Sequence, residues 1–336
     1  DIAASIQKVT EDIMIKLSRS IRKEYNIKNL CLAGGVALNC VANGKILKSK
    51  IFDNIWIQPA AGDAGGSLGA ALALWYLDQG NERKINSNDD MNGSYLGPEF
   101  TQNQIEEELK SIGAIFETVD YERLINQTAE YLSSEKAIGW FQGRMEFGPR
   151  ALGGRSILGD PRSEKMQKNL NLKVKYRESF RPFAPSILKE DLSNWFNLNI
   201  ESPYMLLVAE INSEKKIEMT EEQKQLFGID KLNIKRSEIP AVTHIDYSAR
   251  IQTVNQKNNK PYYDLISKFK EKTGCPVIVN TSFNVRGEPI VNTPTDAFNC
   301  FMGTELDYLV IGNSILEKNK QDSNLKKDYT KEFELD

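Results

Sequence analysis

Apolar positions recur with a helical period at the start of the chain and then gather into short runs. Residues 2–25 place an apolar side chain every three or four positions, which predicts an amphipathic helix. Apolar runs at 29–35 and 51–59 predict buried strands, ended by a glycine pair and by a proline. Helices are expected at 36–49 and, after a glycine turn, within 60–77. This alternation predicts an α/β layer fold with its site at the strand ends.

A polar stretch divides the chain into two predicted domains. Residues 80–94 are rich in Gly, Asn and charged side chains, and we place a domain boundary there. The first domain is expected at 1–90 and the second at 95–320. The charged tail 321–336 is expected to be frayed or loosely docked.

Elements of the second domain follow from the same patterns. It is expected to begin with a helix near 101–112 and to contain buried strands at 137–143 and 276–280. A helix and a strand are predicted within 296–316. Residues 212–238 are charged and poor in aromatic side chains, so we interpret them as a surface excursion.

Length and composition limit the function classes. With 336 residues, 40% hydrophobic and 26% charged, the chain is typical of a soluble globular protein of two domains. A formal net charge of −3 argues against general nucleic-acid binding, which needs a broad positive footprint. No apolar run reaches the ~20 residues of a membrane helix, and the first residues lack a secretory signal pattern. The four cysteines form no CxxC pair and are expected to be reduced thiols of a cytoplasmic protein.

The run GRMEFGPRALGGR, residues 143–155, is the densest candidate for chemistry. It holds Arg144, Arg150 and Arg155 with one proline and four glycines. The arginine fork binds phosphate or carboxylate oxygens two at a time, and glycine lets backbone N–H groups approach an anion. A solvated basic loop is the alternative interpretation. Residues 140–190 favour anion binding, because they contain 11 Lys/Arg against 5 Asp/Glu, a local charge of +6.

A second basic segment, KYRESFRPFAPS, begins at Lys175. Lys175 and Arg177 would share a face if this stretch is extended, and Arg181 precedes a proline that keeps it out of a helix interior. Like charges this close repel by about 4 kcal/mol for a pair at ~4 Å and an effective dielectric of ~20. A bound polyanion, shared with Arg150 and Arg155, is therefore predicted.

Two glycine-rich turns in the first domain are further candidates. Gly34 and Gly35 come between a predicted strand and helix, where N–H groups at the helix start would bind an anion or nucleotide. Asn39, one turn into that helix, would reach a ribose or base. Tight packing of strand on helix is the alternative for this turn. Asp63 lies on the second turn, either as a helix cap or as a metal or phosphate-side ligand.

Two polar segments in the second domain complete the candidates. In HIDYSARIQTV, polar and apolar residues alternate from His244 to Arg250, which predicts a strand with one polar face. That face either belongs to the site or faces solvent. In NTSFN, Ser282 and Asn284 lie in a turn after a buried strand. Short hydroxyl and amide side chains suit phosphate or carbamoyl-like groups there, and a plain turn is the alternative.

Together these stretches resemble O-carbamoyltransferases of the NodU/CmcH type, which include nodulation enzymes and enzymes that tailor antibiotics. The matching segments run in order from residue 30 to residue 291, so the resemblance covers most of the chain. Its most specific part is FGPRALGGRSIL followed by FRPFAP. The segments are LAGGVALNCVANGKI, PAAGDAGGSLGAAL, GWFQGRMEFGPRALGGRSIL, KYRESFRPFAP, HIDYSARIQTV and CPVIVNTSFNVRGEPIV.

The resemblance implies a fold and a two-stage reaction. The second half of an actin/Hsp70-like domain, of the RNase H-like class, would be followed by a YrdC-like α/β domain. The YrdC-like domain would form carbamoyl adenylate from carbamoyl phosphate and ATP with Mg²⁺, and would release pyrophosphate and phosphate. The actin-like domain would pass the carbamoyl group to an acceptor hydroxyl, of sugar or antibiotic type, beside Fe²⁺ or a similar divalent metal.

Residue roles follow from the same resemblance. A catalytic set of cations would grip carbamoyl phosphate and the phosphates of ATP, because two anionic reactants meet only where positive charge is concentrated. Asp63 would be the metal ligand. The catalytic set is Arg150, Arg155, Lys175, Arg181 and Arg250. The substrate and nucleotide contacts would be His244, Ser282, Asn284, Gly34, Gly35 and Asn39.

One part of the family pattern is missing. The family's metal also needs a His-x-x-x-His pair, and this chain has the single histidine His244. The sequence begins about where the second half of the actin-like domain begins. We therefore expect a fragment of a longer protein, in which adenylate formation survives and transfer to an acceptor does not.

Two other functions stay open at the level of sequence. A catalytically silent regulator would bind ATP without any dependence on carbamoyl phosphate. A nucleic-acid module would use the basic window 140–190, because YrdC relatives serve tRNA modification. The net charge of −3 disfavours the second of these.

Overall fold

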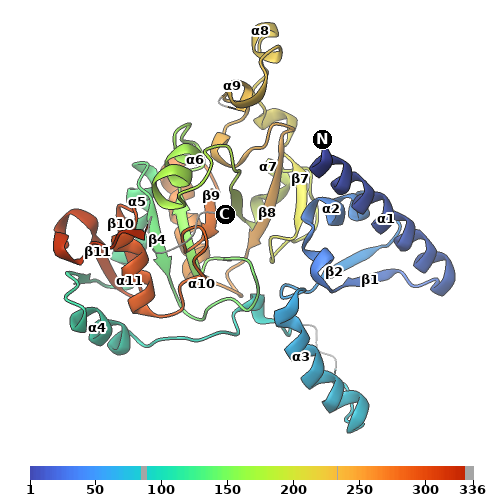
Figure 1. The fold of residues 1–336 in the computed structure, drawn as a ribbon, viewed down its shortest axis with the longest axis horizontal. Helices are drawn as coiled ribbons and strands as arrows, with labels where there is room; N and C mark the ends of the chain where they lie inside the picture. The colour runs from blue at the N-terminus through green and yellow to red at the C-terminus, as the bar shows by residue number, and fades with distance from the viewer. Residues whose placement is uncertain (85–88, 233, 330–336) are drawn as a thin grey trace.

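Two sheets of unequal size organise the protein (Figure 1). The structure, a computed structural model, describes residues 1–84, 89–232 and 234–329. A two-stranded sheet near the N-terminus is followed by a nine-stranded mixed sheet. This confirms the predicted mixed α/β class. None of the described helices is long and apolar enough to cross a membrane.

The small sheet is a parallel pair joined by a helix. α1 (Ile2–Tyr25) leads into β1 (Asn29–Leu32), and α2 (Cys40–Lys48) crosses over to β2 (Asn54–Ile57), which pairs with β1 in parallel. α3 (Asp63–Ala73) extends away from the rest of the molecule (Figure 1). The predicted alternation of strand and helix is confirmed here, since a parallel pair requires a crossover connection.

The apolar side of α1 remains exposed. The predicted helix at 2–25 is confirmed, and it is held to α2 by the buried Glu11, which pairs with Lys45. Its periodic apolar side chains are nevertheless 41–63% exposed. Periodicity therefore identified the helix, but it did not show that the apolar side of the helix stays exposed. These side chains are Ile6, Val9, Ile13, Leu17 and Ile21.

The large sheet has the strand order β3-β11-β10-β4-β5-β9-β6-β8-β7. The pairs β10–β4 and β6–β8 are parallel, and the other neighbours are antiparallel. The strands predicted at 137–143 and 276–280 are confirmed, and the end of the chain supplies two strands where one was predicted. The strands are β3 (Glu117–Thr118), β4 (Ile138–Phe141), β5 (Arg155–Gly159), β6 (Ala184–Leu188), β7 (Leu207–Glu210), β8 (Ser248–Val254), β9 (Val277–Ser282), β10 (Tyr308–Ile311) and β11 (Ser314–Glu317).

α10 (Lys260–Thr273) and α11 (Pro294–Gly303) pack on the large sheet, and each has another helix packed against it. α10 packs against β6 and β9 and against α5 (Tyr121–Ser133). α11 packs against β4 and β10 and against α4 (Gln102–Ser111), the helix predicted near 101–112. The predicted surface excursion carries two short helices at the outer edge of the molecule (Figure 1). The remaining short helices are α6 (Met166–Asn169), α7 (Leu192–Trp195), α8 (Glu221–Lys224) and α9 (Gly228–Leu232).

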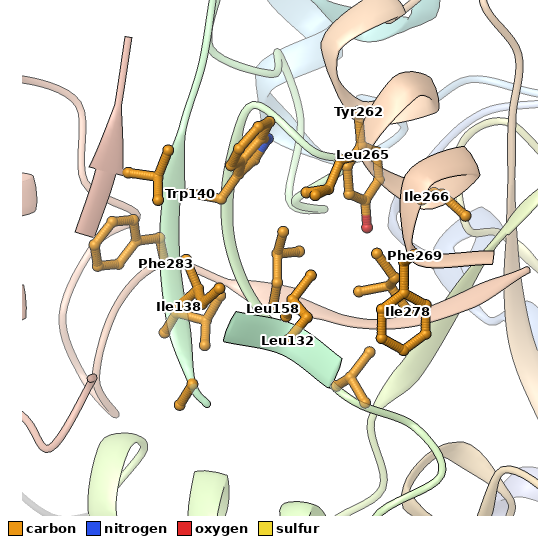
Figure 2. Close-up of a cluster of buried hydrophobic side chains, with 14 of the residues drawn as sticks. Leu132, Ile138, Trp140, Leu158, Tyr262, Leu265, Ile266, Phe269, Ile278 and Phe283 are labelled. Carbon is orange, nitrogen blue, oxygen red and sulfur yellow. The ribbon is translucent and has the colours of Figure 1, made fainter. Parts of the chain in front are cut away.

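Strand and helix side chains share one apolar core. Figure 2 shows Trp140, Leu158 and Ile278 of the sheet facing Leu265 and Phe269 of α10, and all of them are fully buried. The indole N–H of Trp140 donates a hydrogen bond of 2.9 Å to the backbone carbonyl of residue 153. The core is thereby tied to the arginine-rich loop that follows β4.

The two sheets meet through close backbone contact. Asn43 of α2 donates a hydrogen bond of 3.2 Å to the carbonyl of Leu206 beside β7. Gly44 lies so close to this strand that an added Cβ would be 2.6 Å from the carbonyl oxygen of Val208. The division into domains at 1–90 and 95–320 stays a prediction, and residues 85–88 of the proposed linker lie outside the described residues.

The polar segment at 244–250 is a strand only in part. β8 begins at Ser248, and the residues before it form a turn in which the Tyr247 N–H donates to the His244 carbonyl (3.0 Å). The Asp246 carboxylate closes this turn by accepting from the Ser248 N–H (3.1 Å) and hydroxyl (2.6 Å). The prediction of one strand from His244 to Arg250 was wrong, because a short acidic side chain that bonds its own backbone competes with the ladder.

The segment that contains Lys175 is also not extended. A π-helical turn over Leu170–Val174 ends there, with the Lys175 N–H donating to the Leu170 carbonyl (2.9 Å). Tyr176 then adopts a left-handed φ of 49°, and the Arg177 N–H donates to the Asn171 carbonyl (3.0 Å). Because a helical end is followed by a left-handed residue, the condition under which Lys175 and Arg177 would share a face is not met.

The start of the charged tail is docked rather than frayed. Gln321 exchanges two hydrogen bonds with the backbone of Ile115, of 2.9 and 2.8 Å. Tyr329 is 5% exposed and lies against Gly303 of α11. Residues 330–336 of the predicted tail lie outside the described residues.

Replacing Gly44 by alanine is expected to separate the two sheets. The new Cβ would meet backbone atoms of β7, which cannot move as a flexible side chain does, so Gly44→Ala should cost about 1–3 kcal/mol of unfolding free energy. Urea denaturation measures this change. Gly66→Ala on α3 is the matched control, since nothing lies within 4 Å of its Cβ position. Equal stability of the two variants would contradict the close contact.

Candidate functional site

The loop between β4 and β5 is folded around the carboxylate of Glu146. This side chain is 5% exposed, and its Oε1 atom accepts hydrogen bonds from the backbone N–H groups of Leu152 (2.6 Å), Gly154 (2.7 Å) and Arg155 (3.4 Å). A buried carboxylate thus replaces the ladder bonds that an irregular segment lacks. The GRMEFGPRALGGR segment is therefore an anchored loop and not a solvated basic surface.

Arg155 is fully buried, and backbone oxygens occupy its guanidinium. Four carbonyl oxygens accept from it at 3.0–3.2 Å, and its cation lies 3.5 Å from the centre of the Phe141 ring. Burial lowers the pKa of Arg155 to about 10. The structure does not bring it together with the other predicted cations. The four carbonyl groups belong to Gln142, Gly143, Gly154 and Pro98.

Arg150 and Arg250 carry almost uncompensated charge. Arg150 makes one long hydrogen bond of 3.5 Å to the Leu38 carbonyl, and its buried Nε has no partner among the described residues. The guanidinium of Arg250, on β8, makes no hydrogen bond or ion pair with any residue that the structure describes. Burial, and then the positive charges of Arg150 and Arg177, lower the pKa of Arg250 to about 10. These three guanidinium groups therefore share one neighbourhood.

Lys175 is buried, and the charge of Arg177 acts on it. Its ammonium donates to the Ser282 hydroxyl (3.1 Å), the Asn284 carbonyl (2.8 Å) and the Asn284 side-chain oxygen (2.7 Å), and it also contacts the Ser282 carbonyl. Burial, reinforced by the charge of Arg177, lowers the pKa of Lys175 to about 7. The structure thus brings together three of the predicted residues, Lys175, Ser282 and Asn284.

Arg177 was not assigned to the site from the sequence, although the same KYR segment contains it. Its Nε donates to the Asn171 side-chain oxygen (2.7 Å), and its cation lies 5.0 Å from the ring of Phe183. Burial, and then the charge of Arg181, lower the pKa of Arg177 to about 10. Arg181 itself is 44% exposed and pairs with Glu178 at 2.8 Å, so it lies at the rim.

His244 borders the cluster from the turn before β8. Burial lowers the pKa of its imidazole, and the charges of Arg250 and Arg236 act in the same direction, while Asp246 opposes them. The neutral imidazole therefore prevails at neutral pH. A neutral ring beside Arg250 offers a hydrogen-bonding group without adding another charge.

The first glycine turn lies open beside the arginines. Gly34 has a φ of 95°, which favours glycine, and its N–H donates to the Ala61 carbonyl (2.8 Å). Added Cβ atoms at Gly34 and Gly35 would meet nothing within 4 Å. Asn39 was predicted one turn inside the helix, but it is the N-cap of α2 and accepts from the Ala42 N–H (3.1 Å). The helix begins later than predicted because a short 3₁₀ segment precedes it.

Asp63 stands apart from the cationic cluster. It is the first residue of α3, where Gly62 is the N-cap, and its side chain is exposed. Among the described residues no group of three His, Cys, Asp or Glu side chains is placed to hold a metal ion. The role of Asp63 as a metal ligand stays a prediction.

The arrangement as a whole is suited to a small, highly charged anion. Arg150, Arg177 and Arg250 lie together, and the two described carboxylates that act on the cluster are Glu178 at the rim and Glu288 beside Lys175. Buried like charges without neutralising carboxylates destabilise a protein unless a ligand supplies the missing charge. Phosphate esters and acyl phosphates fit this requirement, because their oxygens match the arginine fork.

Family models match both parts of the chain. The model described as Carbamoyltransferase C-terminus matches residues 129–318, which is more than half of the chain. The model described as Carbamoyltransferase N-terminus matches residues 1–72. The first match contains the arginine-rich loop and the segments of Lys175 and Ser282, and the second contains the glycine turn at Gly34.

Curated relatives match nearly the whole chain. An uncharacterized protein of Synechocystis sp. is 56% identical over 100% of this chain and 55% of its own length. Nodulation protein NolO of Bradyrhizobium diazoefficiens is 40% identical over 95% of this chain and 54% of its own length. The chain thus spans about half the length of these relatives. A crystal structure of full-length HypF in the phosphate- and nucleotide-bound form aligns with a TM-score of 0.34 and 16% identity, over 55% of this chain and 20% of that chain, which is too weak to support an argument.

Replacing Arg250 by methionine is expected to stabilise the protein. The variant removes a half-buried cation that has no ion pair and that Arg150 repels, so Arg250→Met should gain about 1–3 kcal/mol of unfolding free energy in urea denaturation. Arg155→Met is the matched control with the opposite expected sign. It removes the donor of the Gln142 and Gly143 carbonyls, whereas the Gly154 and Pro98 carbonyls keep a backbone N–H, and it should lose ~2–4 kcal/mol. A loss of stability in both variants would contradict the electrostatic description of Arg250.

Anion binding is expected to draw in a proton at about pH 8. Because the pKa of Lys175 is about 7, its amine is mostly neutral there, and a nearby anion raises that pKa and favours the ammonium. Calorimetric titration with sulfate, which does not itself titrate in this range, measures the uptake in two buffers of different ionisation enthalpy. At about pH 6 the uptake should vanish, since Lys175 is already charged. Persistence of the uptake in Lys175→Met would assign it to another group.

Proposed function

This chain belongs to the carbamoyltransferase family, and we propose that its cationic cluster binds carbamoyl phosphate and the phosphates of ATP and forms carbamoyl adenylate. The observation that carries the proposal is the convergence of Arg150, Arg177 and Arg250, none of which forms an ion pair with a described carboxylate. Two anionic reactants repel each other in water, and a site with a surplus of fixed cations removes this barrier before the chemistry begins.

The proposed reaction divides into two balanced steps. Water cleaves carbamoyl phosphate to carbamate and inorganic phosphate. A carbamate oxygen then attacks the α-phosphorus of ATP, and the bond to the β-phosphate oxygen breaks to release pyrophosphate. Mg²⁺ bound to the nucleotide would supply charge neutralisation, beside Arg150, Arg177 and Arg250 of this chain.

The cations have different roles according to where they lie. Arg150, Arg177 and Arg250 neutralise the phosphates, and Lys175 holds the serine–asparagine turn and responds to the bound charge by taking up a proton. Arg181 lies at the rim. Its ion pair with Glu178 is exposed to solvent, so Arg181 can leave Glu178 and bind an incoming phosphate. Arg155 stabilises the loop by donating hydrogen bonds to its backbone carbonyls.

Ser282, Asn284 and His244 supply uncharged contacts at the same place. A hydroxyl, an amide and a neutral imidazole bind carbamoyl and phosphate oxygens without adding charge. In the first part of the chain, Gly34 and Gly35 leave room beside the Leu38 carbonyl that Arg150 contacts. We assign the adenylate to this open turn, with Asn39 serving the helix rather than the ligand.

The transfer of the carbamoyl group to an acceptor hydroxyl is the second stage of the proposal. An adenylate is a mixed anhydride, so an attacking hydroxyl oxygen displaces AMP from the carbamoyl carbon. The first 90 residues would be the second half of an actin-like domain, and residues 95–320 a YrdC-like domain. Asp63 would contribute one ligand to a divalent metal at this stage, and no step is assigned to that metal here.

Pyrophosphate release tests the first stage. The protein, incubated with ATP and carbamoyl phosphate, is expected to release pyrophosphate, and Arg150→Ala should reduce the rate by at least about 100-fold through loss of charge stabilisation. Arg144→Ala is the control from the same loop, since Arg144 is 55% exposed and pairs with Glu99. Wild-type turnover by Arg150→Ala would remove that arginine from the site. ATP binding without any pyrophosphate would instead support the regulator that binds nucleotide without turnover.

A further inference from the structure

The residues that follow Arg150 have no strand or helix to hold them. Residues 151–154 lie between the arginine and the start of β5, and their peptide groups are bonded to side chains from other parts of the fold. Glu146 takes the N–H groups on one side of this segment. Two carbonyl groups of this segment accept hydrogen bonds from two buried amide side chains of the large sheet.

Gln252 and Asn280 are these two amides. The Gln252 side chain donates to the Leu152 carbonyl at 2.7 Å, and the Asn280 side chain donates to the Ala151 carbonyl at 3.1 Å. Asn280 also donates to the Gln252 side-chain oxygen at 2.8 Å, so the two amides act as one unit. Ser186 of β6 joins them by donating to Gln252 (2.6 Å) and accepting from Asn280 (3.1 Å). Both amides are at most 2% exposed.

Strand register places each amide beside a member of the cationic site. Gln252 lies two residues after Arg250 on β8, and Asn280 lies two residues before Ser282 on β9. Residues two apart on a strand share a face of the sheet. β8 and β9 are the two neighbours of β6, and Ser186 lies opposite Gln252 in that ladder. One face of three adjacent strands therefore carries both the site residues and the amides that hold the loop.

We propose that Gln252 and Asn280 are positioning residues, which fix Arg150 relative to Arg250 and Ser282. The inference rests on the proposed function, since it concerns the same anion site. Arg150 makes a single long hydrogen bond of its own, so the place of its guanidinium is set by the backbone that carries it. The amide pair fixes that backbone immediately after the arginine.

Loss of either amide is expected to misplace a charge without removing it. The Leu152 carbonyl keeps a second donor, the Tyr95 hydroxyl at 2.7 Å, so the loop stays attached when Gln252 is replaced. A shift of about 1 Å in a binding group costs up to ~100-fold in a reaction that depends on orientation. The expected result is a folded protein whose anion affinity falls although every cation is present.

Gln252→Leu and Asn280→Leu test the proposal by sulfate affinity, measured from thermal stabilisation by increasing sulfate. Each variant should weaken sulfate binding by roughly 10- to 100-fold, close to the effect of Arg150→Ala. In a double variant with Arg150→Ala, neither should weaken it further, because the amides act only through that arginine. Gln321→Leu is the matched control. It removes a buried glutamine that likewise holds a backbone carbonyl, but at the far edge of the sheet, and it should leave sulfate affinity unchanged.

The outcomes separate this proposal from the proposed function. Non-additive loss of sulfate affinity supports the positioning role, even if the wild-type protein releases no pyrophosphate and the proposed reaction fails. Pyrophosphate release together with unchanged sulfate affinity in both amide variants overturns the positioning role and leaves the reaction standing. Additive loss in the double variants also overturns it, since it would show that the amides act on binding by a route other than Arg150. Unchanged sulfate affinity in Arg150→Ala itself overturns both.

Discussion

Electrostatic repulsion among half-buried cations is the constraint around which this protein is arranged. Arg150, Arg177 and Arg250 act on one another in a region where described carboxylates act only at the rim and beside Lys175. Desolvation and like-charge repulsion both disfavour such a cluster, and natural proteins retain features of this kind where a ligand completes them. The cost is tolerated because the surrounding structure holds the cations by groups other than counter-ions: a buried carboxylate, a serine–asparagine turn and a pair of amides within the sheet.

The mixed sheet makes this arrangement possible. The loop before β5, the strand β8 and the end of β9 are far apart in sequence, but they lie beside one another because β5, β9, β6 and β8 are consecutive in the sheet. Glu146 accepts from the N–H of Leu152, and Gln252 donates to the carbonyl of the same residue. The small sheet then brings the turn at Gly34 next to the arginines, with the Leu38 carbonyl in contact with Arg150. A site built at this junction faces both parts of the chain, which is the geometry that a two-stage transfer would use.

Sequence patterns predicted some features and missed others for identifiable reasons. The helix at 2–25 and the strands at 137–143 and 276–280 were predicted, since strong helical periodicity indicates a helix and a short apolar run indicates a buried strand. The grouping of Lys175 with Ser282 also agrees with the structure. Asn39 and His244 were misplaced, because a cap and a turn depend on hydrogen bonds between neighbouring groups and not on hydrophobic spacing.

Residue type and local order determined by themselves that the protein is a mixed α/β chain, that residues 140–190 carry surplus positive charge, and that its motifs resemble those of carbamoyltransferases. Only the tertiary structure decided which cations remain available. Arg150 and Arg155 lie five residues apart in one glycine-rich run, yet backbone carbonyls occupy the second and leave the first nearly unpartnered. The physical reason is that carbonyl oxygens are present at every residue and carry no signature in the sequence. Whether a guanidinium hydrogen-bonds to carbonyl oxygens depends on the path of the backbone. That path is determined only when strands distant in sequence pair.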